Sequence, residues 1–172
     1  MNGTVLVVYA TKDGATKEIA EVIGQTLRAA RREAEVLAAE GMKDLSTYAA
    51  IILGSAVYVA QWRKEAVTFL ETHEKVLAER PVWLFSSGPT GSGDAVQLMS
   101  GWRFPDSEKP IAERIHARDL ALFHGELDPK KLNFPEKLIL KGIKAPLGDF
   151  RDWQAVRGWA QTVAETLKNE GI

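Results

Sequence analysis

Cysteine is absent from this chain of 172 residues, and its absence removes several kinds of chemistry at once. Disulfide bonds, thiolate nucleophiles, iron–sulfur ligation by cysteine and dithiol redox chemistry all need a sulfur atom that the chain cannot supply. Any electrons that the protein stores must therefore sit on a bound cofactor. An excess of positive charge is also missing, because the formal net charge is −1, and we expect no nucleic-acid partner.

The chain also lacks a long apolar segment. The longest nearly apolar run, Ala49–Ala60, is interrupted by Gly54, Ser55 and Tyr58 and is shorter than the roughly 20 residues that cross a bilayer. No basic leader with a cleavage site precedes the first apolar run, so we expect a cytoplasmic protein. The content of hydrophobic residues (45%) and the length both suit one folded domain over residues 1–172.

Apolar runs and amphipathic segments alternate along the chain. We expect β-strands at Thr4–Ala10, Glu33–Ala38, Ile51–Gly54, Val82–Ser86 and Leu120–Gly125. We expect helices at Gly14–Arg31, Arg63–Glu79, Glu108–Arg118 and Trp153–Lys168, with residues 87–106 as a loop. This alternation predicts an α/β fold with a doubly wound parallel sheet and helices on both faces.

The loop after the first strand has the composition of a phosphate site. A helix begins directly after it, and the free N–H groups of a helix N-terminus attract anions. Neither G-x-G-x-x-G nor a Walker lysine motif is present, which disfavours dinucleotides and nucleoside triphosphates. The alternative is a simple helix cap made by Asp13, whose carboxylate we expect to turn away from a phosphate and accept local N–H groups. The candidate phosphate-binding residues are Thr11, Lys12, Asp13, Gly14, Ala15 and Thr16.

Two further loops follow strands that we expect to end at the same edge of the sheet. Ser55, Ala56, Val57 and Tyr58 combine small residues with an aromatic ring, which suits a planar ligand. The alternative is that Tyr58 and Trp62 only anchor the next helix. The later loop can present backbone polar groups to a heterocycle, or it can be a flexible turn. Its candidate residues are Ser87, Gly88, Pro89, Thr90 and Gly91.

The residues of the first two loops resemble a known family. The segment Tyr9–Ala20, which contains Thr-Lys-Asp-Gly-Ala-Thr, and the segment Gly54–Tyr58 are similar to the flavodoxin family. Within it, the Asp-Gly form of the phosphate loop looks most like the branch that contains menaquinone-dependent protoporphyrinogen IX dehydrogenase. The resemblance implies a five-stranded parallel sheet of order 2-1-3-4-5 and bound FMN. It also implies that residues 11–16 hold the phosphate and that the two later loops flank the isoalloxazine.

Two departures from ordinary flavodoxins affect the expected function. Pro89 stands where many members place a stacking aromatic residue, which leaves one flavin face open to a substrate or partner. The chain also lacks the marked acidity of carrier flavodoxins, which argues against a strongly reducing carrier. The resemblance thus implies an FMN-dependent oxidoreductase that passes electrons from a reduced substrate to a quinone or other acceptor, with a porphyrinogen as the candidate substrate. The alternative is an electron carrier between protein partners, and a flavin-free signalling domain is a third hypothesis.

A basic amphipathic segment lies before the last helix. Lys130–Lys144 carries five lysines and one glutamate among leucine, isoleucine and phenylalanine residues. Such a segment can bind an anionic membrane, here the inner membrane, or hold an acidic apolar ligand such as a porphyrinogen. The alternative is a surface helix or hairpin that packs its leucine and isoleucine side chains inward and leaves its lysines in water.

No catalytic side chain stands out. His73, His116 and His124 are scattered without metal-ligand spacing, so we expect no metal site and assign all three to structural or surface positions. The chemistry would then belong to the flavin, and the protein would supply orientation and electrostatics.

Overall fold

A parallel sheet forms the centre of the protein in the computed structural model, which describes residues 3–172. Five strands make up the parallel sheet: β1 (Thr4–Ala10), β2 (Ala34–Ala38), β3 (Tyr48–Tyr58), β5 (Val82–Ser87) and β6 (Leu120–Phe123). Their order is β2-β1-β3-β5-β6, and every pair along this path is parallel. When these five strands are counted consecutively, the order is 2-1-3-4-5, which confirms the expected flavodoxin-like fold.

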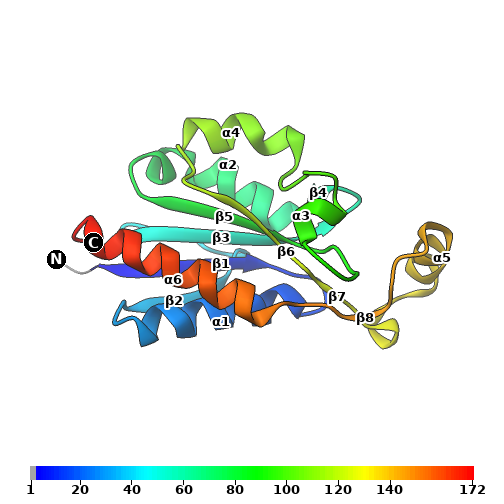
Figure 1. Ribbon diagram of the computed structural model, residues 1–172. Helices are drawn as coiled ribbons and strands as arrows, with labels where there is room; N and C mark the ends of the chain where they lie inside the picture. The colour runs from blue at the N-terminus through cyan, green and yellow to red at the C-terminus, as the bar shows by residue number, and fades with distance from the viewer. Residues whose placement is uncertain (1–2) are drawn as a thin grey trace.

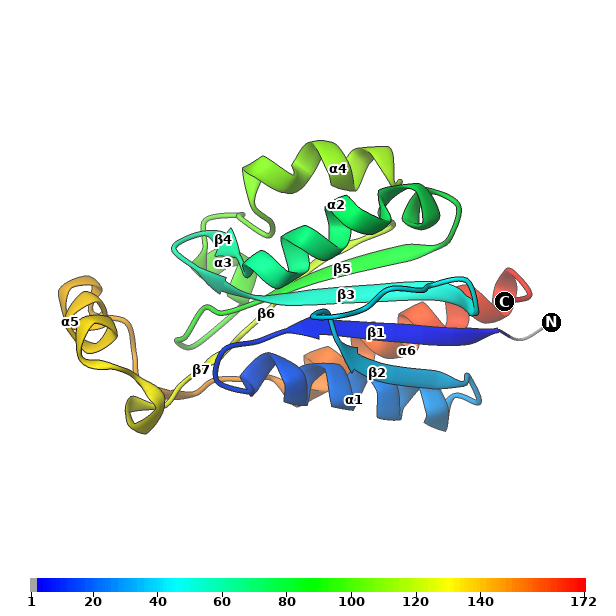
Figure 2. The same ribbon diagram turned by 180° about the vertical axis from the view of Figure 1, so that it is seen from behind.

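Helices cover both faces of the sheet (Figures 1 and 2). One face carries α1 (Ala15–Ala29) and α6 (Trp153–Asn169), which contact each other. The other face carries α2 (Lys64–Ala78) and α4 (Lys109–Arg114), which also contact each other. A 3₁₀ turn at Asp106–Glu108 directly precedes α4. The expected layering is therefore confirmed.

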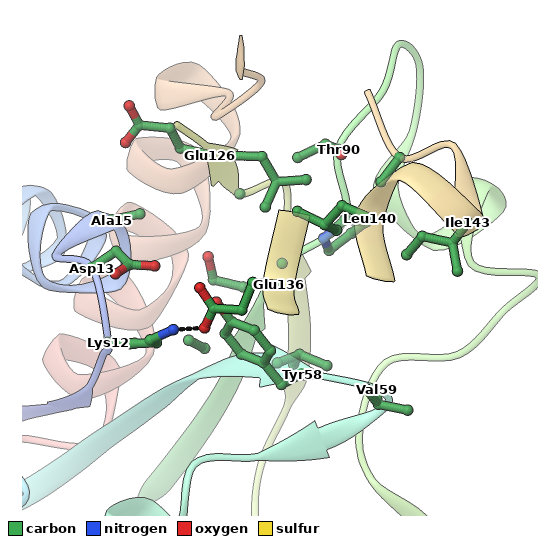
Figure 3. A pocket seen from close by; sticks show the side chains of 18 of the residues that line it. Lys12, Asp13, Ala15, Tyr58, Val59, Thr90, Glu126, Glu136, Leu140 and Ile143 are labelled. Atoms are coloured by element: carbon green, nitrogen blue, oxygen red, sulfur yellow. Dashed lines mark ion pairs between the residues drawn. The ribbon is translucent and has the colours of Figure 1, made fainter. Parts of the chain in front are cut away.

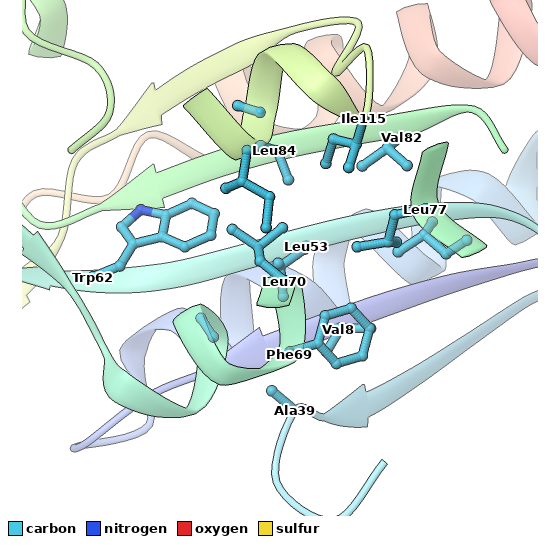
Figure 4. Close-up of a cluster of buried hydrophobic side chains, with 14 of the residues drawn as sticks. Val8, Ala39, Leu53, Trp62, Phe69, Leu70, Leu77, Val82, Leu84 and Ile115 are labelled. Atoms are coloured by element: carbon cyan, nitrogen blue, oxygen red, sulfur yellow. The ribbon is translucent and has the colours of Figure 1, made fainter. Parts of the chain in front are cut away.

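The hydrophobic core is divided by the sheet into two clusters, because successive strand residues point to opposite faces. Leu6 and Val8 of β1 pack toward α2 and α4, together with Ile51 and Leu53 of β3. Figure 4 shows Val8 and Leu53 in this cluster. The intervening Val5 and Val7 pack toward α1 and α6. Both faces of β1 are thus buried, which explains its continuous run of apolar residues without polar alternation.

Several expected boundaries were wrong. The strand expected at Ile51–Gly54 extends over Tyr48–Tyr58, and its end pairs with the antiparallel strand β4 (Gln61–Trp62). The segment expected as a loop at 87–106 contains the short helix α3 (Ala95–Leu98), capped by Asp94. The helix expected to reach Arg118 ends at Arg114, and the strand expected to reach Gly125 ends at Phe123. The other elements differ from expectation by one or two residues at their ends.

An insertion between β6 and α6 stands away from the sheet (Figure 1). Its base is a pair of two-residue antiparallel strands, β7 (Glu126–Leu127) and β8 (Gly148–Asp149). Between them lie a 3₁₀ turn at Pro129–Lys131 and helix α5 (Phe134–Ile143), which begins with a capping box between Asn133 and Glu136. Within residues 3–172, no helix combines the length and hydropathy that a membrane span requires.

Candidate functional site

A cavity of about 540 Å³ opens where the central strands of the sheet end, a volume typical of small-molecule sites. Its floor comes from the loops after β1, β3 and β5, as the topology of an open parallel sheet requires. Its far wall comes from α3, the loop after it and α5 (Figure 3). Of the candidate residues, the following line the cavity: Thr11, Lys12, Asp13, Ala15, Thr16, Ala56, Val57, Tyr58, Ser87, Gly88, Pro89 and Thr90.

The loop after β1 is shaped by a glycine. Gly14 has φ +93° and is the N-cap residue of α1, a conformation that other residues adopt at a cost. Its N–H group donates to Thr11 Oγ1 at 3.0 Å, which folds the loop back on itself. The first turn of α1 leaves further N–H groups without partners inside the helix, so they can meet an anion. Gly14 shapes this loop from outside the set of residues that line the cavity.

The expected role of Asp13 as the helix cap was wrong. Gly14 occupies the N-cap position and α1 has no side-chain cap, so the carboxylate of Asp13 does not make that bond. Asp13 instead lines the cavity near Tyr58. Burial raises the pKa of the Tyr58 phenol, and the negative charge of Asp13 raises it further. The phenol therefore stays protonated and can donate a hydrogen bond into the cavity at neutral pH.

Lys12 connects the phosphate loop to the insertion. Its ammonium group forms an ion pair with Glu136 of α5 and lies 5.6 Å from the centre of the Tyr58 ring (Figure 3). Both side chains of the ion pair are partly shielded, with exposed fractions of 30% for Lys12 and 16% for Glu136. Glu136 also accepts the N–H of Asn133 at 2.9 Å, which fixes the first turn of α5. The carboxylate of Glu136 thus connects the first turn of α5 to the loop after β1.

The loop after β3 is a tight hairpin with strained residues at its tip. Val59 (φ +48°) and Ala60 (φ +58°) both have positive φ, a conformation that Asn and Gly adopt far more easily in two-residue hairpin turns. Both residues line the cavity. Behind them, Trp62 is buried and donates from Nε1 to Ser86 Oγ at 2.8 Å. The interpretation of Trp62 as an anchor is therefore confirmed, whereas Tyr58 lines the cavity.

Ser55 supports this loop from inside. Its side chain is fully buried and its hydroxyl oxygen accepts the N–H of Arg63 at 2.9 Å, the residue that precedes α2. The same hydroxyl donates to the carbonyl of Ala56 at 2.8 Å. Ser55 therefore lies outside the set of cavity-lining residues and fixes the connection from the end of β3 to α2.

The loop after β5 is held by His124, which directly follows β6 and is buried. Its Nδ1 lies 3.0 Å from the carbonyl oxygen of Pro89, and its Nε2 lies 2.6 Å from that of Gly93. Both ring nitrogens thus lie within hydrogen-bond distance of backbone carbonyl groups of this loop. Gly91, which has φ +135° and is a candidate residue, is not among the residues that line the cavity. The expected structural role of His124 thus consists of fixing this loop.

Sequence reasoning anticipated only part of the far wall of the cavity: it gave the basic segment the alternative of holding an apolar ligand, and it treated residues 87–106 as a loop. Part of this wall comes from α3 and the residues after it, Leu98, Met99 and Trp102. The rest comes from the basic segment, whose cavity-lining apolar residues are Leu132, Ile139, Leu140 and Ile143. The lysines of this segment are exposed as expected, but its apolar side chains are not all packed inward, because Phe134, Leu138, Ile139 and Ile143 are exposed as well. The helical spacing of Ile139, Leu140 and Ile143 marks an apolar stripe, although this spacing alone does not place the stripe at the cavity.

A nearly buried arginine fixes the base of the insertion. The guanidinium of Arg151, which is 6% exposed, donates to both carboxylate oxygens of Asp149 at 2.8 and 2.7 Å. It also pairs with Glu18 of α1 and with Glu126 of β7. These hydrogen bonds lower the pKa of the Asp149 carboxyl group. Because the partners belong to α1, β7 and β8, Arg151 fixes the insertion to the helix whose N-terminus lines the cavity.

The other histidines lie away from this cavity. His73 is buried on α2 and its Nε2 lies 3.2 Å from the carbonyl oxygen of Met42. His116 follows α4 with φ +53°. Across residues 3–172, no group of three or more metal-binding side chains comes together.

Comparison with known proteins gives one family and one fold. A model of the flavodoxin domain matches residues 6–154. An archaeal flavodoxin has 17% identity and a TM-score of 0.60, with 96% of this chain and 99% of that chain covered. Flavodoxin 2 from Bacillus cereus has 21% identity and a TM-score of 0.58, with 98% and 99% covered.

A larger protein contains the same fold. The rubredoxin oxygen:oxidoreductase of Desulfovibrio gigas has 14% identity and a TM-score of 0.62, with 96% of this chain but 36% of that chain covered. At these identities, the structural likenesses concern the fold alone. The comparison with curated proteins gives no significant match.

Proposed function

The chain belongs to the flavodoxin family, and from this premise we propose that residues 1–172 form one FMN-binding domain that passes electrons from a reduced, largely apolar substrate in the cavity described above to a quinone or other acceptor. FMN is the cofactor of this family, and its members transfer electrons to redox partners. When bound, FMN supplies the capacity to accept and donate electrons one or two at a time. The chain itself has no sulfur-based redox group to do so, since it has no cysteine.

The residues around the loop after β1 fit a phosphate. Thr11, Lys12 and Thr16 bring two hydroxyl groups and one cation to the N-terminus of a 15-residue helix. Thr16 is buried, so its hydroxyl group would meet a ligand with little competition from water. We propose that residues Thr11 to Thr16 hold the phosphate, Gly14 by its backbone conformation and the others by lining the site.

The loops after β3 and β5 fit the flat ring of the cofactor. Ala56, Val57 and Tyr58 line one side of the cavity and Ser87 to Thr90 line the other. Gly88 approaches Val57 so closely that an added Cβ would lie 3.2 Å from that side chain. Pro89 lines the cavity where a stacking aromatic residue would otherwise stand, so a ring bound there would keep one face accessible.

The observation that carries the enzyme proposal is the apolar far wall. Trp102, Ile139, Leu140 and Ile143 line the side of the cavity beyond the loops that would hold FMN. A carrier that only exchanges electrons with proteins needs an exposed flavin edge and does not require an apolar wall beside it. The wall therefore supports a substrate with a large apolar surface next to the flavin. A porphyrinogen, with a large apolar ring and acidic side chains, and a quinone acceptor are the proposed reactants, as in protoporphyrinogen dehydrogenases.

The experiment first titrates the purified protein with FMN and follows quenching of flavin fluorescence. The flavin is then reduced by light in the absence of oxygen, with EDTA as the electron donor, and mixed in a stopped-flow instrument with menadione, a soluble naphthoquinone. In a second experiment, oxidised protein is mixed with protoporphyrinogen. We expect rapid reoxidation by the quinone and reduction by the porphyrinogen. Loss of both reactions in protein that binds FMN would leave the electron carrier as the function.

A pair of variants on α5 separates the two functions further. Leu140→Ser changes the cavity wall, whereas Leu138→Ser changes the opposite side of the same helix. We expect Leu140→Ser to slow both small-molecule reactions and to leave FMN affinity and electron transfer to cytochrome c unchanged. Leu138→Ser should match the wild type in all of these solution assays. Equal rates in the two variants would contradict a substrate site at the far wall.

A further inference from the structure

Helix α5 has two apolar stripes on opposite sides. Glu136, Ile139, Leu140 and Ile143 have the spacing i, i+3, i+4, i+7 and line the cavity. Phe134, Lys137, Leu138 and Lys141 repeat the same spacing two residues earlier, so this second stripe lies about 200° around the helix. We call the second set the outward stripe. A helix of a globular domain normally has one apolar stripe, so the outward stripe requires a separate explanation.

The outward stripe is exposed to a degree that is unusual for large apolar residues. Phe134 is 73% exposed and Leu138 is 56% exposed, and no residue of α5 is buried. Ile139 and Ile143 are also exposed, at 58% and 66%, but they line the cavity, whereas Phe134 and Leu138 line no cavity. The insertion stands away from the sheet, so neither layer of helices covers this side of α5 (Figures 1 and 2). Leu147, at the return of the insertion, is also 55% exposed. Exposed aromatic and aliphatic side chains gathered on one projecting helix mark an interaction surface.

The charges around the outward stripe indicate the kind of partner. The segment Lys130–Lys144 has five lysines, all exposed, and one glutamate. That glutamate, Glu136, belongs to the cavity stripe and its charge is already paired with Lys12. Because the whole chain has a formal net charge of −1, the rest of the molecule has an excess of acidic residues. The positive charge is therefore concentrated on the insertion, beside its exposed apolar residues.

We propose that the outward stripe of α5 docks on a bilayer surface with anionic headgroups. Lys137 and Lys141 lie on the stripe itself and would reach the headgroups, while Phe134 and Leu138 would enter the boundary between headgroups and acyl chains. An acidic protein surface would pair with the lysines, but it would not by itself bury the exposed apolar side chains of Phe134 and Leu138. The docked helix would leave the cavity stripe facing the protein.

This inference deepens the proposed function and rests on it in one respect, because a quinone acceptor would reach the cavity from the bilayer. The docking itself requires no turnover. Vesicle binding and FMN binding are therefore measured separately. Loss of vesicle binding in a protein that binds FMN overturns the docking proposal alone, and vesicle binding without FMN binding overturns the proposed function alone.

The experiment sediments the full chain with vesicles of phosphatidylcholine, with or without phosphatidylglycerol. We expect binding to the anionic vesicles, weaker binding to the neutral ones, and release by salt. Each lysine near an anionic surface strengthens binding about fivefold, so Lys137→Gln/Lys141→Gln should bind about 25-fold more weakly. The matched control removes two exposed lysines elsewhere, Lys75→Gln/Lys168→Gln, and should bind nearly as the wild type does.

The apolar residues are tested with Phe134→Glu/Leu138→Glu, which should stay in the supernatant. Both positions are exposed, so folding should be preserved, and the circular dichroism spectrum checks this. The absence of cysteine allows a second measurement, because Leu138→Cys provides a single site for an environment-sensitive fluorophore. Its emission should shift to the blue with anionic vesicles, and a label at Glu71→Cys on α2 should not respond.

Three results would overturn the proposal. The first is a wild-type chain that stays in the supernatant with both kinds of vesicle, which would leave a protein as the partner of this face. The second is equal loss of binding in the outward-stripe variants and the lysine controls. The third is a fluorophore at Leu138→Cys whose emission wavelength does not change when anionic vesicles are added.

Discussion

The ion pair between Lys12 and Glu136 makes a prediction that can be tested at single-residue level. Glu136→Gln removes the negative charge but keeps the capping box of α5, because glutamine fills the same N3 position in such boxes. The change therefore isolates the ion pair from the helix cap. We expect α5 to detach more often from the loop after β1 while its own helical structure persists.

The size of the effect follows from the depth of the pair. Fully exposed ion pairs contribute about 0.2–1 kcal/mol, and breaking a buried pair costs about 3–5 kcal/mol. With side-chain exposed fractions of 30% and 16%, this pair lies between these limits and nearer the exposed one, at about 1 kcal/mol. No residue of α5 is buried, so little packing resists its detachment. The detached population should rise about fivefold.

Hydrogen exchange measures this population. Backbone amides of α5 in Glu136→Gln should exchange about fivefold faster than in the wild type. Lys12→Gln should give the same increase, and the double variant should add nothing further, because both changes break one interaction. Lys137→Gln removes a neighbouring lysine that lies on the outward stripe, and it should leave the exchange rates unchanged.

The two single variants should differ in FMN binding. Lys12→Gln removes a cation from the proposed phosphate site and should weaken FMN, whereas Glu136→Gln frees Lys12 for the phosphate and should bind FMN at least as tightly as the wild type. Wild-type exchange rates in Glu136→Gln, or additive effects in the double variant, would refute the assignment of Glu136 as the group that holds α5 closed.

Three further predictions concern the loops and the sheet. Gly14→Val should abolish FMN retention and lower stability by about 1–2 kcal/mol, because φ is +93° and a β-branched residue resists this conformation; an FMN titration and a thermal melt measure both effects. His124→Ala should leave two backbone carbonyl groups of the loop after β5 without their donor, and limited proteolysis should cut that loop faster. The hydrogen bond to Glu35 raises the pKa of Tyr48 from 10.0 to about 12, so its contribution to stability is complete below pH 10.0 and disappears as the pH rises through about 12. Denaturant unfolding of the wild type and Tyr48→Phe should therefore converge across that interval.

The sheet and its order could be predicted because the signal is local and strong. β1 begins and ends at the expected residues, since a strand buried on both faces needs apolar residues at every position. The loop after it could also be located, because a helix N-terminus after a parallel strand falls at the ligand-binding edge. The cap of that helix was assigned to the wrong residue, because a glycine with positive φ took the position that favours aspartate.

The far wall could not be predicted because it depends on tertiary position. The sequence of α5 has apolar residues on two opposite stripes, and spacing alone does not say which stripe meets the cavity. The hairpin after β3 gave no turn signal either. Val59 and Ala60 stand where such a turn favours asparagine and glycine, so the local sequence disfavours the conformation that β4 and the buried Trp62 impose.

Because the two stripes lie on opposite sides of α5, the ion pair with Lys12 and the proposed contact with a bilayer use different side chains of the helix. Glu136 holds the helix to the loop after β1 from the cavity side, and Phe134 and Leu138 project from the other side. Contact of the outward stripe with a bilayer therefore does not require the ion pair to break. It follows that Glu136→Gln should change hydrogen exchange in α5 without changing vesicle binding, and that Phe134→Glu/Leu138→Glu should do the reverse. A variant of either kind that changed both measurements would mean that docking and closure are one motion of the insertion.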